Sequence, residues 1–184
     1  IEEVQNLATI AEAKLTPIES PSRFVEMKVS VVEGQKNNTG HGKVVIDSSI
    51  EELAANQYIY GRKSNEEFYK DELGIMRNVL KNDEHHLIVR SIYDLKIPGF
   101  DHREFLWRKI WKRLDQDTII LVYEPVADLD PEWNFPVEEK AVRARSWTFV
   151  KFVKLPDLAG GIPQTRISYM SQMDLAGHVP ADLI

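Results

Sequence analysis

The second half of the chain consists largely of segments in which aromatic and β-branched residues alternate with polar ones. Alternation with a period of two is typical of strands that bury one face, and turn residues separate the segments. Five such segments occupy residues 85–94, 105–114, 118–126, 142–153 and 165–174. The first half of the chain has helical signals. With the long run of strands that follows, it predicts an α+β domain with a mostly antiparallel sheet.

The first half mixes helical and strand signals. A helix is predicted at the start of the chain, because one stripe at helical spacing holds Val4, Leu7, Ala8, Ala11 and Leu15. Residues 24–32 and 43–46 alternate as strands, and residues 74–80 are expected to form a further strand. Short helices are predicted after the second strand, where helix-start capping boxes are formed by Ser49 with Glu52 and by Ser64 with Glu67.

Length and charge exclude several classes of protein. A chain of 184 residues suits one domain, and we expect residues 1–184 to form it. No apolar run reaches 18 residues, so no membrane span is predicted. A net charge of −6 argues against a general nucleic-acid surface, and the absence of cysteine excludes disulfides, thiol catalysis and thiolate metal sites. The lack of cysteine fits a reducing compartment, and we expect a cytoplasmic protein.

The familiar catalytic and cofactor motifs are missing from the sequence. There is no glycine-rich phosphate loop and no His-Glu-x-x-His pair. His85 and His86 are adjacent, so on a strand they would face opposite ways. The other histidines fall in predicted turns, where solvated roles are expected: His41, His102 and His178. We therefore expect a binding protein that is not an enzyme and that uses no cofactor or metal.

Several strand segments carry large rings and a few polar groups on the same face. The predicted faces group Phe105, Trp107 and Trp111 with Lys109; Trp147 with Phe149; and Ile167 with Tyr169, Ser171 and Met173. Such a face would suit the wall of a cavity, and it would equally suit a packed core. A cluster of basic residues from Arg103 to Arg113 is divided between the two faces of its strand. A solvated surface or a contact with anionic headgroups is expected there, and nucleic acid is not.

Three phrases of the sequence point to a known family. They are Arg103-Glu104-Phe105 at the start of a strand; Val142-Arg143-Ala144 after a proline-containing loop; and Asp174, Gly177 and Pro180 near the end. In this order the phrases, over roughly residues 40–184, resemble the steroidogenic-acute-regulatory-protein-related lipid-transfer (START) family. The resemblance implies a helix-grip fold. In this fold a curved antiparallel sheet wraps around a long C-terminal helix, and a lipid-sized tunnel lies between the sheet and the helix.

The resemblance also implies where the gripping helix and the tunnel loop should lie. The helix would begin near Pro180, so its body is expected to be missing or truncated. The uncovered trough would then be filled by lipid, detergent, the N-terminal helix or another copy of the chain, which makes self-association an expected outcome. The loop of residues 124–141 would cover the tunnel mouth, where Trp133 and Phe135 either contact a membrane or pack on the body.

The expected lipid-binding residues follow from the predicted faces and the resemblance. They are Val89, Ser91, Phe105, Trp107, Lys109, Trp147, Phe149, Tyr169, Ser171 and Met173. Lys109 occupies the position at which some sterol-binding members have an arginine, and Ser91 aligns with the acidic partner of that arginine. The buried ion pair of those members is therefore expected to be absent. A lone buried lysine favours an acidic or phosphate-bearing ligand, or a side chain that reaches solvent.

The function implied is non-enzymatic binding of a single lipid for exchange between membranes. A lipid ligand and a transient, peripheral contact with a membrane surface are the expected partners. Two alternatives stay open. The first is a ligand-sensing module of a larger protein. The second is a cavity enzyme of the cyclase or hydrolase type, for which Lys109 and Tyr169 would be the acid–base candidates.

Overall fold

The computed structural model describes residues 1–31, 37–59, 73–126 and 136–177. Four features predicted from the sequence lie outside these residues. They are the helix start at Ser64, His178, the tip of the loop with Trp133 and Phe135, and the helix start at Pro180.

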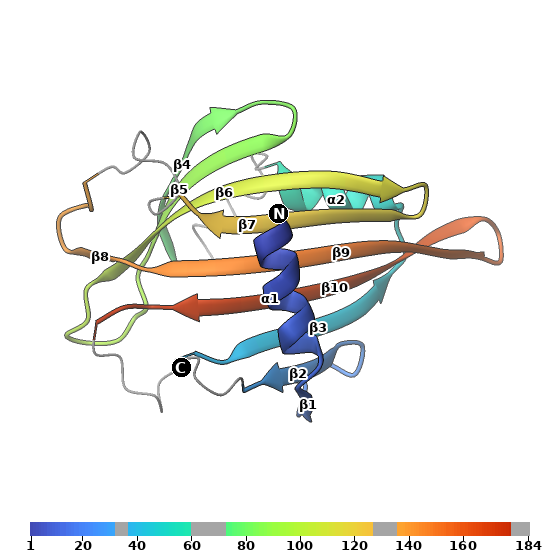
Figure 1. The fold of residues 1–184 in the computed structure, drawn as a ribbon, viewed down its shortest axis with the longest axis horizontal. Coiled ribbons are helices and arrows are strands. Elements are labelled where there is room, and N and C mark those ends of the chain that lie inside the picture. Colours follow the sequence, from blue (N-terminus) through green and yellow to red (C-terminus); the bar gives the residue numbers. More distant parts are fainter. Residues whose placement is uncertain (32–36, 60–72, 127–135, 178–184) are drawn as a thin grey trace.

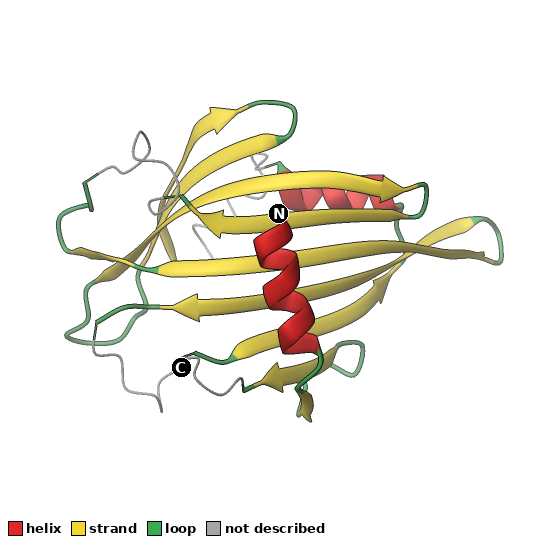
Figure 2. Ribbon diagram, viewed as in Figure 1, coloured by secondary structure: helices red, strands yellow, loops and turns green. Residues whose placement is uncertain are grey.

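Two helices and ten strands make up the described fold (Figures 1 and 2). In chain order they are α1 (Glu2–Glu12), β1 (Leu15–Ile18), β2 (Glu26–Ser30), β3 (Thr39–Ile46), α2 (Ile50–Tyr58), β4 (Gly74–Asn82), β5 (His86–Tyr93), β6 (His102–Asp115), β7 (Thr118–Pro125), β8 (Ala141–Arg143), β9 (Arg145–Leu158) and β10 (Ile162–Asp174). The α+β class is confirmed.

The strands form one curved sheet in the order β1-β2-β3-β10-β9-β7-β6-β5-β4. Every pair along this path is antiparallel. The short β8 lies off the path and pairs with β6 in parallel. The mostly antiparallel sheet predicted from the sequence is therefore confirmed.

The N-terminal helix is confirmed, but it ends three residues earlier than the apolar stripe suggests. Leu15 belongs to β1, a strand that the sequence did not predict because Pro17 lies within it. A proline cannot donate a hydrogen bond to the strand ladder. It is tolerated here because β1 is the edge strand of the sheet and Pro17 pairs only with Lys28 of β2.

The helix predicted after the second strand is α2, and its start is capped as expected. The Ser49 hydroxyl accepts a hydrogen bond from the Glu52 amide at 3.2 Å. The Glu52 carboxylate does not complete the box; it accepts from the Ser48 hydroxyl at 2.7 Å. The buried face of α2 consists of Ile50, Ala54 and Tyr58.

The two helices cover opposite faces of the sheet (Figure 1). α1 crosses the outer face, where Val4, Ala8 and Ala11 pack with Val122, Trp147 and Met170. α2 packs on the inner face against residues that include Leu87, Val89, Ile119, Leu121 and Phe152. Neither described helix is long and apolar enough to cross a membrane. Within the described residues, no helix follows β10.

Candidate functional site

The inner face holds a cavity beyond the point where the core around α2 ends. Its volume is about 520 Å³. The wall is formed by Asn56, Gln57, Leu73, Arg77, Tyr93, Leu95, Phe105, Trp107, Lys109, Tyr123, Ser146, Thr148, Tyr169, Ser171, Met173 and Leu175. These residues come from α2, from the strands β4, β5, β6, β7, β9 and β10, and from the segments that adjoin them.

The strand register gives this cavity a closed end and an outer end. On β6, the alternate residues Phe105, Trp107 and Lys109 line the cavity. Trp111 follows them on the same face of the strand and packs against the core around α2. On β10, Met173 also lines it and Ile167 packs against the same core. The closed end of the cavity is therefore near Lys109, because the core fills the inner face beyond it.

Aromatic rings form much of the wall near the outer end. The rings of Phe105 and Trp107 are stacked, with centroids 4.9 Å apart. Tyr93 meets both of them edge-on, with centroid distances of 5.6 Å and 6.3 Å. The Trp107 indole nitrogen donates to the Ser146 hydroxyl at 2.8 Å, so its polar atom is satisfied and its ring can present apolar surface.

Lys109 lies at the closed end and is almost fully buried, with 1% of its surface exposed. Its amine donates to the Gln57 carbonyl at 3.0 Å and lies 4.5 Å from the centre of the Tyr123 ring. Gln57 is in the last turn of α2, where carbonyl groups lack partners within the helix and carry partial negative charge. Lys109 therefore caps the helix and faces an aromatic ring, two contacts that favour its positive charge.

Burial opposes that charge. Loss of hydration lowers the pKa of Lys109 well below its usual value, and the positive charge of Arg77 lowers it further. Arg77 lies on β4 and also lines the cavity. Among the described residues that line the cavity, none is an aspartate or a glutamate. The polar part of this wall is therefore cationic or neutral.

Two expected site residues on β5 lie on the inner face but do not line the cavity. Val89 is fully buried in the core around α2. Ser91 is also fully buried, between Arg77 of β4 and Phe105 of β6. In the pairing of β5 with β6, the residue directly opposite Lys109 is Leu87. No acidic residue of β5 lies opposite Lys109.

Two other expected site residues lie on the wrong face of the sheet. Trp147 packs in the core beneath α1, and its indole nitrogen donates to the Gln172 side chain at 3.1 Å. Phe149 packs against the same core. The expectation that they line the cavity is corrected, because β9 contributes Ser146 and Thr148 there instead. Alternation showed that the two rings share a face, but it could not show which face is the inner one.

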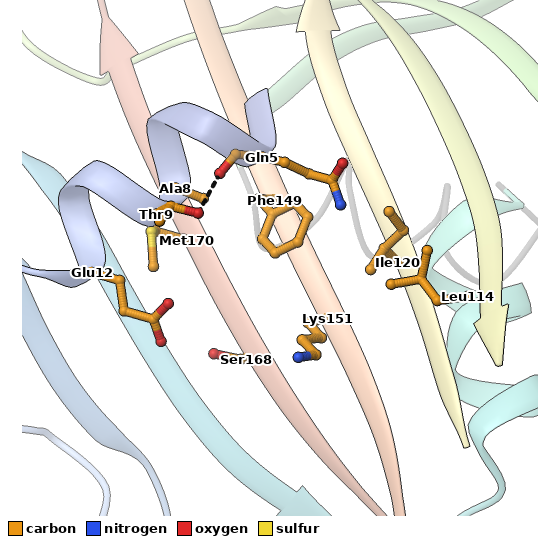
Figure 3. Close-up of a pocket in the computed structure, with 10 residues that line it drawn as sticks. All are labelled: Gln5, Ala8, Thr9, Glu12, Leu114, Ile120, Phe149, Lys151, Ser168 and Met170. Carbon is orange, nitrogen blue, oxygen red and sulfur yellow. Dashed lines mark hydrogen bonds between the residues drawn. The ribbon is translucent and has the colours of Figure 1, made fainter. Parts of the chain in front are cut away.

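A smaller hollow lies on the outer face beside α1 (Figure 3). Its volume is about 220 Å³, and its wall includes Gln5, Glu12, Lys151 and Ser168 along with Phe149. Ser168 is hydrogen-bonded to His41 at 2.8 Å. His41 was expected in a turn, but it is buried in β3. This hollow is smaller than the inner cavity, and its wall combines charged, polar and apolar side chains. The inner cavity is therefore the better candidate for an apolar ligand.

The family phrases have structural roles that the sequence alone did not reveal. Arg103 is 2% exposed and donates to the carbonyls of Asp101 and Ala176, which holds the turn after β10. Glu104 is fully buried and forms ion pairs with Arg90 and with Arg143. The phrases around residues 103 and 143 are therefore joined to each other. Only Phe105, the third residue of the first phrase, reaches the cavity.

The rest of the basic cluster is largely engaged in ion pairs near the surface. Arg108 pairs with Glu124 at 2.6 Å, and Arg113 pairs with Glu51 of α2 at the same distance. The Arg113 hydrogen bond lowers the pKa of Glu51 more than any other contact does. These pairs match the solvated surface expected for the cluster.

Comparison with known proteins identifies the fold. No family model and no curated protein matches the sequence. The chain is similar in structure to human StAR-related lipid transfer protein 5, with 16% identity, a TM-score of 0.77 and coverage of 99% of this chain and 84% of that one. It is also similar to the lipid transfer and protein localization domain of human StarD13, with 18% identity, a TM-score of 0.63 and coverage of 98% and 86%. Human STARD10 is similar at 16% identity, with a TM-score of 0.69 and coverage of 97% and 69%.

These likenesses confirm the fold expected from the sequence resemblance. The chain has the helix-grip fold of the StAR-related lipid-transfer domains. At such low identities the likeness concerns the fold alone, so the ligand and the activity have to be argued from the cavity itself.

Proposed function

We propose that the protein binds one lipid in the inner cavity and exchanges it between membranes without chemical change. The observation that supports this most directly is the cavity, in which Phe105, Trp107 and Met173 provide apolar wall and a few polar groups lie at one end. A volume of about 520 Å³ falls within the range of sites for small organic ligands, roughly 300–1,000 Å³.

The energetics of such a carrier depend on removing the acyl chain from water. Each methylene group that leaves an apolar site for water costs about 0.8 kcal/mol. An apolar wall offsets this cost during transit between membranes. Tyr169 and Met173 are 39% and 53% exposed, so apolar surface remains at the cavity that a membrane or a second copy would cover. We therefore propose peripheral, transient membrane contact by a cytoplasmic protein.

The proposal predicts that narrowing the cavity abolishes lipid binding. Ser171 lines the inner cavity, whereas Ser168 lies on the other face of the same strand and lines the outer hollow. Ser171→Phe should remove most of the bound lipid that native mass spectrometry detects, and it should slow transfer of labelled lipid between vesicles at least tenfold. Ser168→Phe introduces the same ring on the outer face and should leave both measurements unchanged.

The same experiment tests the proposal as a whole. A wild-type protein that carries no lipid after purification and moves none between vesicles would contradict it. Recovery of a chemically altered lipid after incubation would instead favour the cavity enzyme. Equal loss of transfer in both variants would show that the inner cavity is not the binding site.

A further inference from the structure

Three hydroxyl groups lie in the part of the inner cavity wall that β9 and β10 form. They belong to Ser146 and Thr148 of β9 and to Ser171 of β10. Ser146 is 6% exposed and Thr148 is 2% exposed. A buried hydroxyl is costly unless its proton and lone pairs find partners. The hydrogen bonds that these groups make within the protein therefore determine what they still offer to a ligand.

The Ser146 hydroxyl accepts a hydrogen bond and keeps its own proton. The Trp107 indole nitrogen can only donate, and it donates to the Ser146 oxygen at 2.8 Å. Among the described residues, the Ser146 hydroxyl makes no other hydrogen bond. Ser146 can therefore donate its proton to a group inside the cavity.

The Thr148 hydroxyl has the opposite character, because its proton is already used. The Ser171 hydroxyl lies 3.1 Å from the Trp147 carbonyl, which can only accept, so the Ser171 proton belongs to that bond. The Thr148 and Ser171 oxygens are 2.9 Å apart. Since Ser171 has no second proton, Thr148 donates in this bond. Thr148 is left with lone pairs and can only accept from a group inside the cavity.

The donor and the acceptor lie side by side on one strand. Ser146 and Thr148 are two positions apart on β9, so strand alternation directs both towards the cavity. A carboxylate of a ligand could only accept and an ammonium could only donate, so each would leave one of the two hydroxyls unmatched. An unmatched buried polar group is costly. A hydroxyl or an amide of the ligand both accepts and donates, and it matches the pair.

We propose that Ser146 and Thr148 select an uncharged amphiphile whose hydroxyl or amide group accepts from Ser146 and donates to Thr148. This inference rests on the proposed lipid-binding function and specifies the polar group of the ligand. The stacked rings of Phe105 and Trp107 provide apolar wall for the body of the same ligand. Ser171 contributes indirectly, because its bond to the Trp147 carbonyl fixes the direction in which Thr148 donates.

The test compares two ligands that differ in a single hydrogen-bond donor. Delipidated protein is titrated with a pyrene-labelled long-chain alcohol and with its methyl ether, and energy transfer from the tryptophans reports binding. Both ligands have an oxygen that can accept, but only the alcohol can donate. Wild-type protein should bind the alcohol at least tenfold more tightly, because the ether leaves the buried Thr148 oxygen without a donor.

Three variants assign that preference to individual hydroxyls. Thr148→Val keeps the shape of the side chain and should bring the ratio of the two affinities close to one by weakening only the alcohol. Ser146→Ala should weaken the alcohol and the ether alike, since both accept from Ser146, and it should keep the ratio. Thr118→Val removes a hydroxyl that does not line the cavity and should change neither affinity.

The possible results separate this inference from the proposed function. Equal binding of alcohol and ether by the wild type would overturn the selective pair and leave lipid binding intact, and this comparison needs no variant. A preference that Thr148→Val keeps, or that Ser146→Ala alone removes, would also overturn it. Binding of neither ligand by a protein that carries another lipid would overturn the inference alone, whereas a protein that carries no lipid at all would overturn the lipid-binding function. Retained ether binding by Thr148→Val reports that the variant is folded.

Discussion

The most informative single residue is Lys109, because its position is costly for folding. A buried amine loses its hydration, and contacts with a carbonyl and a ring recover only part of that loss. An apolar residue would pack the closed end of the cavity at lower cost. Residues that lower the stability of a fold are most often found at functional sites. The presence of a lysine at this point therefore supports a role in binding.

Lys109→Met should make the delipidated protein more stable at pH values below the lowered pKa of Lys109. Replacing buried charged groups by apolar residues of similar volume often stabilises a protein by about 1–4 kcal/mol. Burial, with a further effect of Arg77, places the pKa of Lys109 in the folded state well below 10.5, its usual value. Urea unfolding of both proteins at several pH values measures the difference in the free energy of unfolding.

The pH dependence of that difference has a definite sign. Below the lowered pKa, Lys109 is charged in the folded and unfolded states, so the full penalty of burial applies. As the pH rises from that value towards 10.5, the folded state gives up its proton first and the wild type gains stability. The advantage of Lys109→Met should therefore shrink as the pH rises. A difference that stayed constant would mean that the amine is not strained by burial.

Much of the element structure could be predicted from the sequence, because it depends on local patterns. The apolar stripe of α1, the Ser49 cap of α2 and the strands β6 and β10 all appear as expected. The face on which a strand's rings lie depends on its register with distant neighbours. For β9 that register is set by β7 and β10, so Trp147 and Phe149 were assigned to the cavity when they belong beneath α1.

Other parts of the site depend on contacts that no local pattern contains. The Gln57 carbonyl reaches Lys109 across 52 positions of sequence, and the backbone of an ordinary helix gave no sign of it. His41 was assigned to a turn because glycines flank it, yet these glycines lie within β3. A signal was available for Ser146 and Thr148, whose small polar side chains alternate with the two large rings.

The ion pairs of Glu104 join elements that are distant in sequence. Its carboxylate contacts Arg143 of β8 at 2.6 Å and Arg90 of β5 at 2.7 Å, and it also accepts from the Glu138 amide at 2.9 Å. Burial alone would raise the pKa of Glu104. The hydrogen bonds from Arg90 and the Glu138 amide, with the charge of Arg143, outweigh burial and hold the pKa below its usual value.

Glu104→Gln should lower the free energy of unfolding by about 3–5 kcal/mol at neutral pH, because removing one partner leaves the other buried charges uncompensated. The stabilisation by Glu104 is present above 4.5, its usual pKa, and is lost as the pH falls through the lower pKa of the folded state. Thermal unfolding of wild type and variant should therefore converge in acid. Glu19→Gln alters an exposed glutamate and should have little effect at any pH, so equal losses in both variants would contradict a special role for Glu104.

At the scale of the whole molecule, the two faces of the sheet differ in how completely they are packed. On the outer face, α1 packs over Val122, Trp147 and Met170, and only a smaller hollow lies beside it. The inner face is packed only as far as α2 extends, and the remainder surrounds the cavity. Regions with fewer buried apolar contacts open at lower free energy than packed cores do. The part of the sheet that surrounds the cavity should therefore be its least stable part.

Lipid binding should stabilise the molecule mainly at that part. A ligand that binds only the folded state raises the free energy of unfolding by about 2.7 kcal/mol at a free concentration one hundred times its Kd. Hydrogen exchange of lipid-loaded and delipidated protein should then differ most at residues 102–109 of β6 and 169–174 of β10. These segments line the cavity, whereas α1 is remote from it. Protection that increased most in α1 and the strands beneath it would place the lipid on the outer face, and protection unchanged everywhere would mean that no lipid is bound.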